Sequence, residues 1–183
     1  DGGKFNKLEE ALQRAEQLQN EGADILDIGG ESTRPGFAAV DSKEELRRVI
    51  PLIKELKKTC KIPISIDTYK AEVAEAALQA GASIVNDISA MQDKKMPAVL
   101  KKYSAGCILM HKHQLDENAD AVQEVKNFLQ NRVQWAVKEF ALKKENFVLD
   151  PGIGFGKTQE QNLSLIKHIA ELRSTGNAVL LGM

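Results

Sequence analysis

Three polar residues, Asp67, Asn86 and Asp150, each stand at the end of a short apolar run, where they could bind a small flat ligand. Carboxylates accept hydrogen bonds from ring N–H and amino groups, while an amide both donates and accepts. Such a set suits a neutral, nitrogen-rich ring, because it supplies no positive charge. The competing interpretation is that each residue caps the following helix. Asp87 is the clearest candidate for that structural role.

A glycine-rich string at residues 29–36, GGESTRPG, offers a second set of ligand groups. Paired glycines allow the backbone to approach a ligand closely, and Thr33 and Arg34 can donate hydrogen bonds to an anion. The planar guanidinium of Arg34 can bind two oxygens at once. The string therefore predicts a site for an oxyanion-rich group. The alternative is a plain connector with an exposed arginine.

Two further strings suggest chemistry that their spacing does not support. The string DPGIGFGKT at 150–158 resembles a P-loop, but a P-loop needs four residues between its first Gly and the Gly-Lys pair. Only three residues separate Gly152 from Gly156, so no ATP site is expected. His111 and His113 lie on one face of an extended segment, yet no third ligand is spaced nearby, so no zinc site is expected. Phe155 is either a pocket wall or a core residue.

The chain alternates amphipathic helical patterns with short apolar runs. Apolar residues three and four apart predict helices over 5–18, 42–56, 73–80, 97–100, 122–140 and 165–172. Apolar runs predict strands over 25–28, 63–67, 84–87, 107–110, 147–150 and 178–181. Ser42 and Glu45 have the spacing of a capping box at the start of the second helix. Strict alternation of this kind requires parallel strands with right-handed crossovers.

Two folds satisfy this alternation: an open doubly wound sheet and a (β/α)8 barrel. The strand ends decide between them, because most carry a polar residue: Asp27, Asp67, Asn86 with Asp87, His111 and Asp150. A doubly wound sheet needs chemistry only at its switch point, whereas a barrel gathers it from the carboxyl ends of many strands. We predict an α/β protein with the (β/α)8 TIM barrel fold, one domain over 1–183. About six of the eight strand–helix units are present, so the barrel is expected to be truncated.

Composition narrows the class of partner. The formal net charge of the 183 residues is −1, which gives no basic field for nucleic acid or a membrane surface. No apolar run reaches the roughly 18 residues needed to span a bilayer. Cys60 and Cys107 have no metal-type spacing and are interpreted as reduced thiols of a cytoplasmic protein.

Taken together, the motifs resemble those of the dihydropteroate synthase family. The matching strings are DIGGESTRPG (27–36), SIDT (65–68), IVND (84–87), LMH (109–111) and DPGIGFGK (150–157). The string DGG at 1–3 is similar to the tail of the family's first catalytic loop. The resemblance implies a transferase of folate biosynthesis. It would join p-aminobenzoate to 6-hydroxymethyl-7,8-dihydropterin diphosphate, giving 7,8-dihydropteroate and diphosphate.

The resemblance also implies roles for single residues. Those that would hold the pterin ring are Asp67, Asn86 and Asp150, with Met110 packing on it and Asp27 nearby. Those that would act on the diphosphate, and so count as catalytic, are Thr33 and Arg34. Those that would line the p-aminobenzoate pocket, where sulfonamides compete, are Pro35 and Phe155.

By the same resemblance, Mg2+ is the expected cofactor, but the asparagine that contacts it in the family would precede Asp1. The first strand and everything after the seventh are expected to lie outside these residues. The full-length parent is expected to be active and to form a homodimer, whereas the 183-residue chain alone is expected to be inactive. The alternatives are a methyltetrahydrofolate-binding corrinoid methyltransferase, which has no diphosphate to bind, and a non-catalytic pterin-binding homologue.

Overall fold

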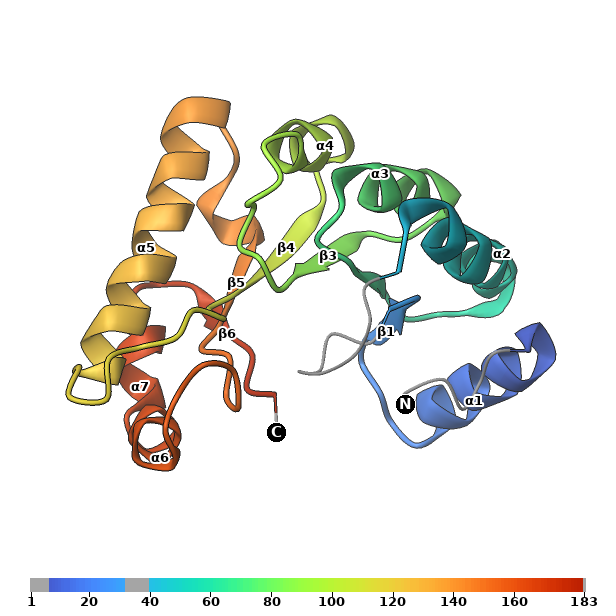
Figure 1. Cartoon of the computed structure of the whole chain (residues 1–183). Coiled ribbons are helices and arrows are strands. Elements are labelled where there is room, and N and C mark those ends of the chain that lie inside the picture. Colours follow the sequence, from blue (N-terminus) through green and yellow to red (C-terminus); the bar gives the residue numbers. More distant parts are fainter. Residues whose placement is uncertain (1–6, 32–39, 183) are drawn as a thin grey trace. The chain divides into compact units, whose positions relative to one another are not determined.

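The computed structural model of the chain describes residues 7–31 and 40–182 (Figure 1). The chain divides into two compact units, unit 1 (Asp1–Asn86) and unit 2 (Asp87–Met183). A single domain over 1–183 stays a prediction. None of the helices in the described part of the chain could cross a bilayer, because none is both long and apolar enough.

Unit 1 alternates helices and strands as predicted. Its elements are α1 (Leu8–Asn20), β1 (Leu26–Gly29), α2 (Ser42–Thr59), β2 (Ile64–Asp67), α3 (Ala71–Ala80) and β3 (Ile84–Asp87), whose last residue opens unit 2. β1 pairs with β2, and β2 with β3, both in parallel. The predicted strand over 84–87 has the same bounds as β3.

Unit 2 continues the alternation. Its elements are α4 (Met96–Tyr103), β4 (Gly106–Met110), α5 (Ala121–Phe140), the 3-10 turn η1 (Lys144–Asn146), β5 (Phe147–Asp150), α6 (Gln159–Lys167), α7 (Ile169–Arg173) and β6 (Ala178–Val179). β4 pairs with β5, and β5 with β6, in parallel. The helix predicted over 165–172 is interrupted at His168, whose ring Nδ1 lies 2.9 Å from the Ser164 carbonyl oxygen.

Within each unit the strands pair in sequence order and the helices lie on one side of them (Figure 1). A doubly wound sheet would carry helices on both faces, whereas a barrel carries them only on its outside. The arrangement inside each unit therefore favours the barrel. The largest fully buried side chains include Ile53 of α2 and Leu129 of α5.

The start of α2 differs from the prediction. Asp41, not Ser42, is the N-cap, and its Oδ1 accepts the Glu44 N–H at 2.9 Å. The predicted capping box is wrong because the Glu45 carboxylate is drawn into a buried ion pair with Lys70. A local pattern met the rule for a capping box, and a tertiary contact overrode it.

Gly30 explains how closely α2 packs against the end of β1. A Cβ atom at Gly30 would lie 2.9 Å from Glu45 Cγ and 2.9 Å from Val49 Cγ1. At Gly29, by contrast, it would meet Asp67 Cβ at 3.4 Å, an ordinary contact. Gly30 is thus required by helix packing.

We expect Gly30→Ala to lower the free energy of unfolding by about 1–3 kcal/mol, the usual cost of overpacking. Gly29→Ala, the matched control, should change it by less than about 1 kcal/mol. Urea denaturation of both variants measures the difference. Equal destabilisation by the two substitutions would contradict the packing argument.

Candidate functional site

Asp27, Asp67 and Asn86 come together at the carboxyl ends of the strands of unit 1. Gly29 pairs with Asp67 and Asp67 with Asn86, so these positions form one row. Directly paired residues in a parallel sheet point to the same face, and so do residues two apart on one strand. All three polar side chains therefore lie on one face.

The side chains of Asp27 and Asn86 meet although β2 runs between their strands. Asn86 Nδ2 donates to Asp27 Oδ2 at 3.0 Å. Asp27 pairs with Ser65, and Ser65 with Ile84, so Asn86 lies two residues beyond the position level with Asp27. Side chains of alternate strands share a layer in a barrel, whose register advances by about one residue per strand. The contact fits a barrel interior.

Met110 and Asp150 are neighbours in unit 2. They pair directly across β4 and β5, and both are buried. Asp150 Oδ1 accepts the Gly152 N–H at 2.7 Å. Burial raises the pKa of Asp150, while that hydrogen bond and the charge of Lys157 act in the opposite direction. The result is a carboxylate with increased proton affinity and one oxygen already bound.

Lys157 is committed to the backbone of unit 2. Its Nζ donates to the carbonyl oxygens of His111 at 2.9 Å, Gly152 at 2.9 Å and Phe155 at 2.8 Å. Burial lowers the pKa of Lys157 to about 8, and the charge of Asp150 opposes that shift. An ammonium with three carbonyl acceptors has no proton left for a phosphate. This geometry supports the rejection of a P-loop on independent grounds. Phe155 itself is partly exposed and thus not a core residue.

His111 is a buried neutral ring. Its side chain is 3% exposed, and Nδ1 has no hydrogen-bond partner among the described residues. The ring packs edge-to-face against Phe128, with centroids 5.0 Å apart, and against His113, at 5.5 Å. Burial lowers the pKa of His111 to about 4, with smaller contributions from the charges of Lys157 and His113.

Metal-binding geometry is absent from residues 7–31 and 40–182, where no group of three or more His, Cys, Asp or Glu side chains could hold an ion. The expected Mg2+ cofactor stays a prediction.

Asp87 supports the loop that follows β3 and does not cap a helix. Its Oδ1 accepts from Ser89 N at 2.8 Å, and its Oδ2 from Met91 N at 2.8 Å. Ala90 and Met91 have φ of 52° and 61°, in the left-handed region. Arg132 of α5 then donates to both of their carbonyl oxygens, at 2.8 and 2.7 Å. The helix-capping role predicted for Asp87 is wrong, because the N-cap of α4 is Lys95 and Asp87 binds the backbone of the loop instead. Arg132 gave no signal in the sequence.

Thr33, Arg34 and Pro35 lie outside the described residues. The residues on either side of segment 32–39, Glu31 and Val40, are described. Both are bound by Lys70, which the sequence analysis did not single out.

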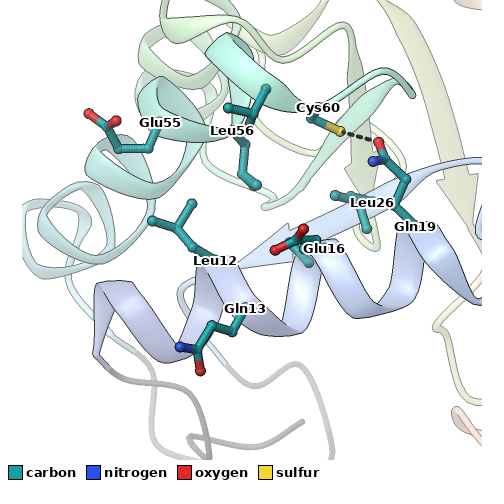
Figure 2. A pocket seen from close by; sticks show the side chains of 10 residues that line it. Leu12, Gln13, Glu16, Gln19, Leu26, Glu55, Leu56 and Cys60 are labelled. Carbon is teal, nitrogen blue, oxygen red and sulfur yellow. Dashed lines mark hydrogen bonds between the residues drawn. The ribbon is translucent and has the colours of Figure 1, made fainter.

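A groove in unit 1 is separate from these residues (Figure 2). It lies between α1 and α2, and the side chains lining it include Leu12, Glu16, Gln19, Leu26, Leu56 and Cys60. The Cys60 thiol donates to Gln19 Oε1 at 3.5 Å. Leu26 is the first residue of β1, whereas the polar row lies at the other end of the strands. The groove is therefore not part of the candidate site.

The loop after β5 allows a matched test of glycine. A Cβ at Gly152 would lie 2.1 Å from the His111 carbonyl oxygen, whereas at Gly154 nothing lies within 4 Å. Both have positive φ, 67° and 83°. Gly154→Ala should cost about 1–2 kcal/mol of unfolding free energy for the backbone conformation alone. Gly152→Ala should cost about 1–3 kcal/mol more, or prevent folding. Chemical denaturation measures both, and equal costs would refute the close approach.

His111 should make stability depend on pH. Its pKa falls from 6.5 to about 4 on folding, so the unfolded chain binds the proton more readily between these values. Stability is therefore lost as pH falls through this window. His111→Phe should reduce the loss between pH 6.5 and 4 by about 2–3 kcal/mol. Denaturation curves of the unsubstituted protein and of His111→Phe at several pH values measure this difference. Other titratable groups contribute equally to the two proteins and cancel. Parallel pH profiles would contradict the shift.

Comparison with known proteins agrees with this geometry. Residues 1–183 match the family described as "Pterin binding enzyme". The dihydropteroate synthase of Clostridium beijerinckii is 46% identical over 183 residues, which are 100% of this chain and 68% of that protein.

Two solved structures are similar throughout the chain. A dihydropteroate synthase from Clostridium difficile, solved in the presence of pteroic acid, has a TM-score of 0.92 and 48% identity over 100% of this chain and 70% of its own. That of Xanthomonas albilineans, with 4-aminobenzoic acid, has a TM-score of 0.91 and 41% identity over 100% and 67%. The predicted (β/α)8 fold class is confirmed. The resemblance to dihydropteroate synthases is likewise confirmed, and the chain belongs to the pterin binding enzyme family.

Proposed function

We propose that this chain carries the pterin-binding part of a dihydropteroate synthase. Such an enzyme is a transferase that condenses 6-hydroxymethyl-7,8-dihydropterin diphosphate with p-aminobenzoate to 7,8-dihydropteroate. The observation that carries the proposal is the row of polar side chains on one face of unit 1. The names of the relatives, and the pteroic acid and 4-aminobenzoic acid in their structures, support it over a methyltransferase or a non-catalytic homologue.

Asp27 prepares Asn86 to bind the ring. A carboxylate only accepts hydrogen bonds, so the amide group that faces Asp27 must be Nδ2. This fixes the amide orientation and leaves Oδ1 and the second Nδ2 proton for a ligand. Asp67, next to Asn86 in the row, adds a carboxylate acceptor on the same face. Together they offer the mixed acceptors and donors that the edge of a pterin requires.

The same role is proposed for Asp150 and Met110 in unit 2. Gly152 occupies one oxygen of Asp150, and the second remains for a ring N–H or amino group. A buried carboxylate of raised pKa is a strong acceptor, because little water competes for it. Met110 adds a polarisable thioether that packs well on a flat ring.

The chemistry itself needs orientation and charge neutralisation. Diphosphate leaves readily once its charge is neutralised, and the dihydropterin delocalises positive charge from its exocyclic carbon. Positioning of the two substrates and stabilisation of the departing anion then suffice, without a protein nucleophile. Thr33 and Arg34 are proposed for the diphosphate, and Pro35 and Phe155 for the p-aminobenzoate pocket. No step is assigned to Mg2+. The homodimer rests on the family resemblance, and the cytoplasmic location on the interpretation of Cys60 and Cys107 as reduced thiols.

Substitutions in the row test the function. In the longest gene product that contains this chain, Asp67→Asn should lower kcat/KM for dihydropteroate formation by about 10- to 100-fold, the effect of one lost charged hydrogen bond. Asp27→Asn should lower it less, because Asp27 acts through Asn86. Asp24→Asn, an exposed carboxylate before β1, is the control and should have no effect. Product formation from radiolabelled p-aminobenzoate measures all three.

Two outcomes would overturn the proposal. A folded protein that binds the pterin diphosphate but forms no dihydropteroate would support the non-catalytic alternative. Equal activity of the Asp67→Asn and Asp24→Asn variants would remove the row from the site.

A further inference from the structure

Lys70 joins three segments of unit 1. Its Nζ donates to Glu31 Oε2 at 2.6 Å, to the Val40 carbonyl oxygen at 2.7 Å and to Glu45 Oε2 at 2.5 Å. Glu31 immediately precedes segment 32–39, and Val40 immediately follows it. The Lys70 ammonium thus donates two hydrogen bonds to the residues on either side of that segment and the third to Glu45 of α2.

The surroundings make these contacts strong. The side chains of Lys70, Glu31 and Glu45 are 16%, 10% and 1% exposed. Burial alone would lower the pKa of Lys70, but the hydrogen bonds and charges of both glutamates outweigh it and raise the pKa. The ammonium therefore stays charged. Tyr69 adds an O–H donated to Glu31 Oε1 at 3.2 Å.

Lys70 supplies positive charge to a cluster that also contains the carboxylates of Glu31 and Glu45. Among the residues that the structure describes, it is the cation that forms ion pairs with both Glu31 and Glu45. Without it, two buried carboxylates would be left side by side, which is strongly unfavourable and would push them apart. Glu45 is held on α2, so Glu31 would have to move.

Stability alone does not account for such a cluster. A buried ion pair is often no more stabilising than apolar residues of similar volume. What it does provide is a defined position for the groups that it binds. The backbone just before Glu31 is fixed as well, because Arg48 donates to the Gly30 carbonyl oxygen at 2.8 Å. Because Lys70 binds both Glu31 and the Val40 carbonyl oxygen, it also fixes the position of Val40 relative to Glu31.

We propose that Lys70 is a positioning residue that holds Glu31 and Val40, the described residues on either side of segment 32–39, in fixed positions. Because the segment contains Thr33 and Arg34, this inference rests on the proposed function for its kinetic consequences. Lys70 itself does not touch the substrate, since its three protons are already donated.

The test uses Lys70→Met, which keeps the length of the side chain without its charge, and Lys70→Arg, which keeps charge and donors. Glu31→Gln serves as a second, milder variant in case Lys70→Met does not fold. Lys58→Met is the matched control, because it breaks a lysine–glutamate pair of 2.7 Å that lies on the exposed surface.

Two measurements are made on the longest gene product that contains the chain. The first is the rate of chymotrypsin cleavage after Phe37, identified by mass spectrometry, which needs no activity. The second compares kcat/KM for p-aminobenzoate with the Kd of a dihydropterin that lacks the diphosphate. The Kd of the dihydropterin measures whether the polar row is intact. The kcat/KM for p-aminobenzoate measures the contribution of segment 32–39.

Chymotrypsin should cleave the Lys70→Met variant faster after Phe37 than it cleaves the unsubstituted protein. The kcat/KM of the variant should be lower by about 10- to 100-fold, because positioning groups are displaced. The Kd of the ring ligand should stay within about threefold of the unsubstituted protein, since the row is intact. Glu31→Gln should show the same pattern more weakly. Lys70→Arg should restore most of the loss, and Lys58→Met should change neither measurement.

The inference fails if Lys70→Met or Glu31→Gln leaves both cleavage and kcat/KM unchanged. It also fails if ring binding weakens in the same proportion as kcat/KM, because the effect is then a general loss of structure. If the unsubstituted protein forms no dihydropteroate, the proposed function fails, and the cleavage rates still decide the role of Lys70.

Discussion

The parallel register of short strands is the constraint on which the candidate site depends. Gly29, Asp67 and Asn86 are separated by 38 and 19 positions in the chain, yet pairing places them in one row. Each crossover helix returns the chain to the same end of the sheet, so every strand presents its last residues there. A shift of one residue would turn the polar side chains of a strand to the opposite face. Register therefore selects which residues can meet a ligand.

The sequence was most informative where local and tertiary preferences agree. β3 and β5 have the predicted bounds, because an apolar run followed by Asn86 or Asp150 is both a good strand and a good strand end. Prediction failed where a distant partner intervened. Glu45 fits a capping box but pairs with Lys70. The packing of α2 against Gly30 was likewise not foreseen, while the ligand role expected of the paired glycines stays a prediction.

Two partly buried lysines show what a sequence alone does not reveal. Lys70 follows β2 and Lys157 follows β5, and each donates three hydrogen bonds. Lys70 binds Glu31, Val40 and Glu45 of α2, and Lys157 binds three loop carbonyl oxygens. From the amino-acid sequence, both would be taken for ordinary surface lysines, and the string that contains Lys157 resembles a phosphate-binding P-loop. Their partners include residues up to 46 positions away, such as His111 for Lys157. Only the folded register brings those carbonyl and carboxylate oxygens within reach. Both lysines thus hold the backbone of neighbouring segments, a role that the motifs did not predict.

The electrostatics of unit 2 bear on which ligand fits. Near the ends of β4 and β5, burial raises the pKa of Asp150 and lowers those of His111 and Lys157. All three shifts have the same physical origin, the cost of removing a charge from water. An environment that disfavours charge of either sign is a poor place for a phosphate and a good one for a neutral ring. A ring that offers N–H groups to Asp150 satisfies the carboxylate without adding a net charge, as a pterin does.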